Sequence, residues 1–201
     1  MRQLGLFLSI TIFAVLVAAV AAVATAETTV ETVRRMCTAP DNQDFSVFDQ
    51  ELLPDILIEI IEDDPLDAEY HERVVSSALK TLGALHVPEA VGVLVSEVEE
   101  YPTTCLYWLG SYDSPEAVAT ILEYLDDEDA SLRCEAVEAL GRLPAPDDET
   151  EEEYAEYIYI AFDRIAERAS IEEDGSVIDA LREASVHIAR LLLEIDSEGT
   201  S

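Results

Sequence analysis

The chain has 201 residues, of which 44 are acidic and 11 are Lys or Arg, so its net charge is −33. Nucleic acids and anionic membranes are bound through clusters of Lys and Arg, and this balance excludes a general binder of either kind. The length accommodates one domain. The charge is compatible with a cationic partner. The alternative is that the acids only keep the surface hydrated, as in proteins adapted to high salt, where ions screen self-repulsion.

Residues 1–26 have the pattern of a secretory signal peptide. One basic residue, Arg2, precedes a long apolar run that ends in Ala24-Thr25-Ala26, a small-x-small cleavage pattern. Residues 27–201 are therefore expected to be exported, either to the periplasm or to the extracellular space. The apolar run over residues 4–23 has about the ~20 residues that span a bilayer, so the alternative is an uncleaved membrane anchor.

The next two predicted helices lie over residues 27–38 and within the apolar stretch 45–61. Pro54 interrupts the second stretch and predicts a kink or a helix that begins there, because proline lacks the N–H that a helix interior needs. We interpret residues 27–64 as a capping hairpin in front of the repeats described next, since the ends of stacked repeats need caps.

Residues 82–91 and 109–118 share the pattern LG····PEAV in register, 27 residues apart. Gly after a run of helix formers predicts a helix end, where the backbone often needs a positive φ. Pro-Glu predicts a helix start, because proline suits the first turn and the acid lies at the positive end of the helix dipole. The apolar residues that follow Pro88 and Pro115 also match, at the spacing of an amphipathic helix.

The repeat predicts helical hairpins with helices over residues 67–82 and 88–100 and over residues 103–109 and 115–126, and residues 130–141 begin a third. A period of about 27–31 residues with two helices indicates stacked hairpins, each burying its apolar face against its neighbours.

The C-terminal part of the chain is expected to form a cap over residues 144–196. An acidic, proline-containing loop leads into helices over residues 154–169 and 177–195, and residues 197–201 form a flexible tail. The apolar residues of the last helix are Ile178, Leu181, Val186, Ile188, Ala189, Leu192 and Leu193.

The sequence LRCEAVEALG at residues 132–141 resembles the first helix of HEAT-like repeats, in the short form also found in phycobilisome lyases. The Pro-Glu helix start at residue 115 and the acidic loop 126–129 fit this resemblance, which covers residues 65–143. It implies an all-α solenoid of about four stacked antiparallel hairpins, and protein binding only by analogy. Tetratricopeptide repeats are the competing helical-repeat family, but here Leu-Gly closes a helix. A non-repetitive helical bundle is the remaining alternative.

We predict no catalytic, metal or cofactor site. His71, His86 and His187 are not at metal-ligand spacing, and the sequence has no HExxH, GxSxG, GxGxxG or phosphate loop. The acidic runs lack the alternating oxygen ligands and the glycine of a calcium loop. His86 is expected to be a solvated turn residue. Tyr107, Trp108 and Tyr112 surround one helix end, where packing is the more common role.

The three cysteines allow one disulfide and one free thiol. Cys105 and Cys134 lie on the first helices of neighbouring hairpins, yet they differ by about 200° in helical phase. We therefore expect Cys105 to be a buried thiol, and the pairing among Cys37, Cys105 and Cys134 stays open.

The second helices of stacked hairpins usually line the inner face. Their non-core positions align between the two repeats and predict an acidic groove with one tyrosine, suited to a basic or Arg-bearing segment of a partner protein. These positions are Ser96, Glu97, Glu100, Glu123, Tyr124 and Asp127. The alternative is a hydrated face without a ligand.

The sequence thus predicts an exported, non-catalytic scaffold or adaptor that binds a protein in the cell envelope. The alternatives are a salt-adapted structural envelope protein without a specific ligand and an enzyme-associated module of the lyase type. The oligomeric state is open.

Overall fold

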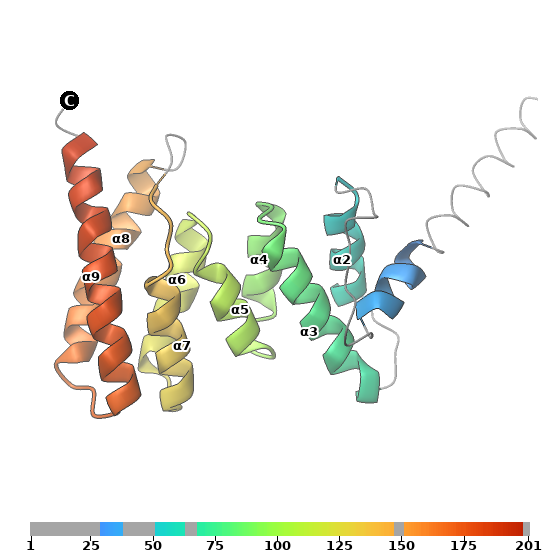
Figure 1. Cartoon of the computed structure of the whole chain (residues 1–201), viewed down its shortest axis with the longest axis horizontal. Coiled ribbons are helices and arrows are strands. Elements are labelled where there is room, and N and C mark those ends of the chain that lie inside the picture. Colours follow the sequence, from blue (N-terminus) through green and yellow to red (C-terminus); the bar gives the residue numbers. More distant parts are fainter. Residues whose placement is uncertain (1–28, 38–50, 63–67, 147–150, 199–201) are drawn as a thin grey trace, which may run out of the picture. The chain divides into compact units, whose positions relative to one another are not determined.

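The computed structural model describes residues 29–37, 51–62, 68–146 and 151–198, and all regular structure in these ranges is helical (Figure 1). The predicted all-α class is therefore confirmed. The chain divides into two compact units, Met1–Ser77 and Ala78–Ser201. The predicted signal peptide over residues 1–26 lies outside the described residues. Among the helices that are described, none combines the length and apolarity needed to cross a bilayer.

The first unit contains a helix over residues 29–37, α2 (Leu53–Glu62) and the beginning of α3 (Ala68–Ala84). Pro54 is the second residue of α2, where its missing N–H costs no hydrogen bond, so the predicted helix start is confirmed. α2 buries Leu53, Leu57, Ile60 and Ile61, which form one stripe along the helix.

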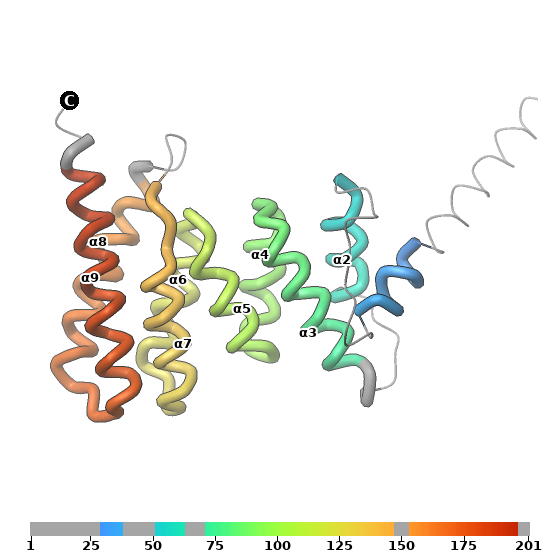
Figure 2. Tube along the Cα trace, viewed as in Figure 1, coloured from blue at the N-terminus to red at the C-terminus, as the bar shows by residue number. Residues whose placement is uncertain are grey.

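The second unit is a stack of helices in two layers (Figures 1 and 2). One layer contains α5, α7 and α9, and the other contains α4, α6 and α8, with each helix packed against the next one in its own layer. The elements are α4 (Glu89–Ser96), α5 (Pro102–Leu109), α6 (Pro115–Glu123), the 3-10 helix η2 (Tyr124–Asp126), α7 (Ala130–Leu140), α8 (Glu151–Ala169) and α9 (Gly175–Glu198).

Short polar side chains begin three of these helices. Ser114 accepts a hydrogen bond from the backbone N–H of Ala117, just before Pro115 opens α6. Asp129 accepts from the N–H of Ser131 at the start of α7, and Asp174 accepts from the N–H groups of Ser176 and Val177 at the start of α9. These bonds satisfy N–H groups that have no partner within the helix.

The predicted apolar stripe of the second helices forms the core between the layers. In α6 and η2 all five matched residues are buried, namely Ala117, Val118, Ile121, Leu122 and Leu125. In α4 and the turn after it, Ala90, Val91, Leu94 and Val98 are buried, whereas Val95 is half-buried. In α9 the buried stripe is Val177, Leu181, Ala184, Ile188 and Leu191. Val186 and Leu193 are 73% and 70% exposed, so two apolar residues of the last helix lie outside the core.

The glycines near the ends of the first helices serve a purpose that the repeat pattern did not predict. No described glycine has a positive φ: Gly110 has φ −65°, and Gly83 lies inside α3. The left-handed conformation belongs instead to His86, with φ 51°. A Cβ atom at Gly83 would lie 2.3 Å from the Trp108 ring, and one at Gly110 would lie 2.5 Å from the carbonyl oxygen of Ala139. These glycines therefore permit close contact between neighbouring first helices.

Replacing Gly110 with alanine should destabilise the fold. The added methyl group would meet the backbone of Ala139, which cannot rotate away as a side chain could, and overpacking of this kind costs about 1–3 kcal/mol. The measurement is the free energy of unfolding by chemical denaturation.

Gly92→Ala is the matched control, because nothing lies within 4 Å of a Cβ atom at this helical position. It should stabilise the protein by up to about 1 kcal/mol through helix propensity. If Gly110→Ala is as stable as Gly92→Ala, close packing at Gly110 is not what the fold requires.

Candidate functional site

A hollow lies between α4 and α6, the second helices of two hairpins, where the sequence predicts an acidic groove. Its volume is about 430 Å³, and it is lined by Val95, Ser96, Val98, Glu99, Thr120, Glu123, Tyr124 and Asp127. Four of the six predicted face residues are therefore brought together around it. The structure places Glu97 and Glu100 outside the lining, and Glu99 lines it instead.

Glu99 lines the hollow in place of the predicted Glu100 because α4 is shorter than predicted. The predicted helix continued to residue 100, but α4 ends at Ser96, and Glu97–Glu100 form turns before α5 begins at Pro102. The helical spacing that was used to align the two repeats no longer applies after residue 96. Pro102, which disfavours a helical conformation in the residue before it, is the sequence signal that could have shown this.

Tyr124 is the aromatic residue among those that line the hollow. Its hydroxyl donates a hydrogen bond to the carbonyl oxygen of Val98, at 3.2 Å, and so ties the end of α6 to the turn after α4. Burial raises the pKa of Tyr124, and the negative charges of Glu99 and Asp127 raise it further. The ring is therefore held in a negative environment beside the apolar side chains of Val95 and Val98.

None of the three carboxylates of the hollow forms an ion pair with a described residue, although Asp127 and Arg133 attract each other electrostatically. Glu99 and Glu123 are exposed, and within the described residues neither forms an ion pair. Asp127 accepts a hydrogen bond from the N–H of Asp129, at 2.7 Å, which fixes its carboxylate while leaving it charged. The hollow therefore presents three carboxylates and one aromatic ring to solvent, an arrangement that attracts a cationic side chain.

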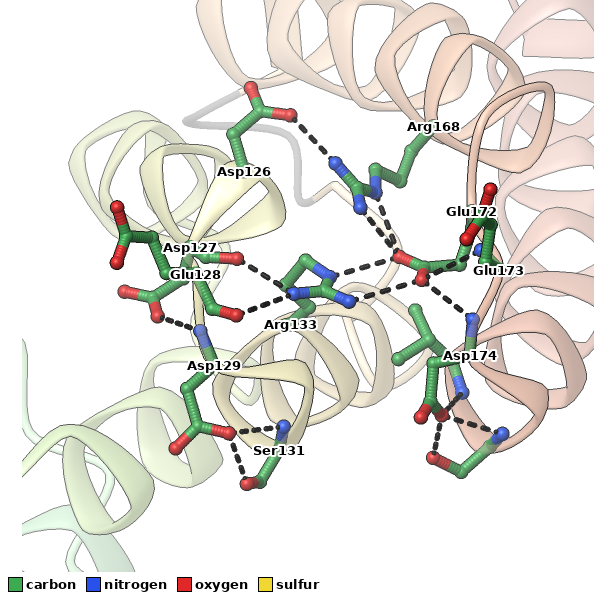
Figure 3. Close-up of polar contacts among 12 residues, drawn as sticks. Asp126, Asp127, Glu128, Asp129, Ser131, Arg133, Arg168, Glu172, Glu173 and Asp174 are labelled. Carbon is green, nitrogen blue, oxygen red and sulfur yellow. Dashed lines mark hydrogen bonds and ion pairs between the residues drawn. The ribbon is translucent and has the colours of Figure 1, made fainter.

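Arg133, which donates a hydrogen bond to the backbone of Asp127, belongs to a separate network of polar contacts (Figure 3). Its guanidinium donates two hydrogen bonds to the carboxylate of Glu172, at 2.9 and 3.0 Å. It also donates to the carbonyl oxygens of Asp127 and Glu128, at 2.8 and 3.1 Å. Arg133 thus joins the loop after η2 to the loop that precedes α9.

Glu172 is the centre of this network. Its side chain is only 2% exposed, and besides Arg133 it accepts hydrogen bonds from Arg168 and from the N–H groups of Glu173 and Asp174. The hydrogen bonds from Arg133, followed by those from Asp174, Arg168 and Glu173, hold the pKa of Glu172 far below its usual range, although burial opposes this. A buried carboxylate with so many donors is stable as a charge.

The network has a structural role, and sequence reasoning did not find it. Arg168 also contacts Asp126, at 3.4 Å, so one chain of ion pairs links the end of η2, α7 and α8. Arg133 and Glu172 are 39 residues apart, and although Arg133 lies in the HEAT-like stretch 132–141, that pattern indicates no partner for its side chain. The available signal was the scarcity of basic residues, which makes an arginine next to the acidic loop 126–129 informative.

The aromatic residues near α5 form a packed cluster, as expected. The Tyr112 hydroxyl donates to the carbonyl oxygen of Gly83, at 3.2 Å, and the ring of His86 stacks on Tyr112 with centroids 5.6 Å apart. His86 is exposed in its turn, which agrees with the prediction of a solvated residue. Arg142 lies 4.5 Å above the Tyr107 ring. These contacts stabilise the end of α5.

The thiols are structural. Cys37, Cys105 and Cys134 are free, and Cys105 is fully buried as predicted. Burial raises the pKa of Cys105 to about 12 and that of Cys37 to about 11, so neither is a thiolate near neutral pH. In the part of the chain that the structure describes, no group of three or more His, Cys, Asp or Glu side chains could hold a metal ion.

The comparison with protein families decides between the helical-repeat readings, because residues 99–152 match the family model described as HEAT repeats. This segment is HEAT-like. It contains the second copy of the repeated pattern and all of α7, so within residues 99–152 the match supports HEAT repeats rather than tetratricopeptide repeats. The comparisons with curated proteins and with solved structures found no match.

Replacing Glu172 with glutamine should destabilise the second unit by about 3 kcal/mol, because it leaves the positive charges of Arg133 and Arg168 partly buried without their carboxylate. The folded-state pKa of Glu172 is lowered, so its contribution to stability is complete above the unfolded-state pKa of about 4.3 and is lost as the pH falls below that value. The difference in unfolding free energy between the two proteins should therefore be constant from pH 7 to about 5 and shrink below about pH 4.

Asp179→Asn is the control for this measurement, because Asp179 and its partner Arg182 are 75% and 72% exposed. An exposed pair of this kind should change stability by less than about 1 kcal/mol. Equal effects of the two substitutions at neutral pH would contradict a special role for Glu172.

Proposed function

We propose that this protein is a non-catalytic HEAT-like scaffold that acts in the cell envelope or outside the cell and binds a partner protein through the acidic hollow between α4 and α6. HEAT repeats commonly mediate protein interactions, which supports the general role. The observation that carries the specific proposal is the meeting of Glu99, Glu123 and Asp127 with Tyr124 around one hollow of about 430 Å³.

The chemistry of the hollow favours an arginine of a basic, extended segment as the group bound. A guanidinium is planar and weakly hydrated, so it can lie on the Tyr124 ring while its N–H groups reach the carboxylates. Val95 and Val98 offer apolar surface to the methylene groups of the same side chain. Export of the scaffold rests on the signal-peptide pattern of residues 1–26.

The proposal is tested by cross-linking in the native envelope. A photoreactive amino acid placed at Ser96, on the edge of the hollow, should capture a partner that is recovered from the envelope fraction. Glu99→Lys and Glu123→Lys should each abolish this capture, since they reverse the charge that attracts the segment. Added salt should weaken capture by the unaltered protein, because exposed charges are screened.

Glu183→Lys is the matched control, because it changes the net charge equally but lies on α9, in the other layer. Capture should persist in this variant. Persistence in Glu99→Lys and Glu123→Lys as well would remove the hollow as the binding site, and recovery of the protein from the cytoplasm alone would contradict export.

The second candidate is a structural, salt-adapted envelope protein without a specific ligand, which the net charge of −33 favours. The two functions predict different salt responses. A salt-adapted protein loses helicity at low ionic strength as its carboxylates repel one another, whereas the scaffold keeps its helicity there and loses only its partner. Circular dichroism during removal of salt distinguishes them. An enzyme-associated module of the lyase type has less support, because an exported chain would not meet a cytoplasmic pigment.

A further inference from the structure

The last hairpin of the second unit has an outward side that carries apolar residues. α8 packs on α6 and α9 packs on α7, so the α8–α9 pair forms the end of the stack that is farthest from α4 (Figure 1). On the side turned away from the core, Val186 is 73% exposed and Leu193 is 70% exposed. These two residues are seven apart, which is two helical turns, so they lie on one side of α9.

α8 continues the same surface. Tyr159 and Phe162 are 44% and 37% exposed, and they are three residues apart on one side of the helix. The Tyr159 hydroxyl donates a hydrogen bond to Asp196 of α9, at 2.6 Å, which shows that this side of α8 adjoins α9. We call the surface formed by Tyr159, Phe162, Val186 and Leu193 the end face.

The end face occupies the position at which a further helical pair would pack, as α8 and α9 pack on α6 and α7. Each helical pair of a repeat stack buries one apolar side on the pair before it and offers the other side to the pair after it. A terminal pair normally has a polar outer side. Exposed apolar residues from both helices of the last pair therefore predict that another helical pair covers them.

The charges around the end face fit a second copy of this chain. Arg182 and Arg190 lie four residues before and after Val186, on the same side of α9, whereas the outward positions of α8 include the exposed acids Glu156 and Asp163. Within the chain Arg182 pairs with Asp179 and Arg190 contacts His187, so these exposed arginines would exchange or share partners on association. If a two-fold axis runs between the helices, α9 of one copy lies over α8 of the other. The arginines of each copy then face acids of its partner, which is the self-complementarity that a symmetric dimer requires.

The size of the end face is sufficient for a weak dimer. α8 and α9 have 19 and 24 residues, or about 28 and 36 Å of helix at 1.5 Å per residue. Two helices side by side are about 20 Å wide, so the face covers roughly 600 Å² per copy. The total of about 1,200 Å² is at the lower end for specific interfaces, where association depends on concentration.

We propose that two copies of this chain associate through the end face, with α8 and α9 of one copy packed across those of the other about a two-fold axis. The association is independent of the acidic hollow, which lies on α4 and α6. Because each copy carries a charge of −33, the two copies repel each other in dilute salt. Salt screens both this repulsion and the exposed ion pairs between the copies. Because the net repulsion is the larger of the two, the dimer forms more strongly at about 1 M salt, where the Debye length is about 3 Å, than at about 0.1 M.

Sedimentation velocity of the unaltered protein over a range of concentrations tests the proposal. The weight-average mass should rise towards that of a dimer with concentration, and more steeply at high salt. Val186→Asp and Leu193→Asp should each leave a monomer under the same conditions. Both residues are already exposed, so circular dichroism should show unchanged helicity.

Ile171→Asp is the matched control, because Ile171 is an equally apolar residue that is 62% exposed in the turn between α8 and α9. It adds the same negative charge without touching the end face, and this variant should dimerise as the unaltered protein does. An unaltered protein that stays monomeric at high concentration in about 1 M salt overturns the proposal. So does a dimer that survives both end-face substitutions, and so does a monomer that instead binds an unrelated protein through this face.

Discussion

Close approach between first helices is the constraint on which the second unit depends. Gly110 faces the backbone of Ala139, with no room for a Cβ atom, and Gly83 faces the ring of Trp108 in the same manner. The glycines let the first helices pack closely together. As one layer they can then cover the apolar stripes of α4 and α6. A larger residue at either position would separate the helices and open the core along their length.

This packing leaves the polar residues to define the two outer surfaces of the stack. In the layer of α4 and α6, the hollow collects carboxylates, and Arg133, whose guanidinium lies beside the backbone of Asp127, directs its side-chain hydrogen bonds to Glu172 instead. The Arg133–Glu172 pair thus stabilises the connection between hairpins and at the same time leaves the hollow negative.

The sequence alone was enough for the parts of the structure that depend on local periodicity. The pattern that links Leu82 to Val91 and recurs from Leu109 to Val118 predicted the helices, their starts at Pro88 and Pro115, and the buried stripe between them. Ser96, Glu123, Tyr124 and Asp127, four of the six residues that it assigned to one face, line a single hollow, since residues at matching positions of stacked helices become neighbours.

Tertiary structure decided what periodicity does not contain. The early end of α4 put Glu99 in the place expected for Glu100, because helical spacing is lost once the chain turns. The purpose of Gly110 is contact with another helix rather than a left-handed turn, and the bond between Arg133 and Glu172 spans 39 residues. Each of these depends on atoms that are distant in the chain, whereas the helices themselves depend on residues three or four apart.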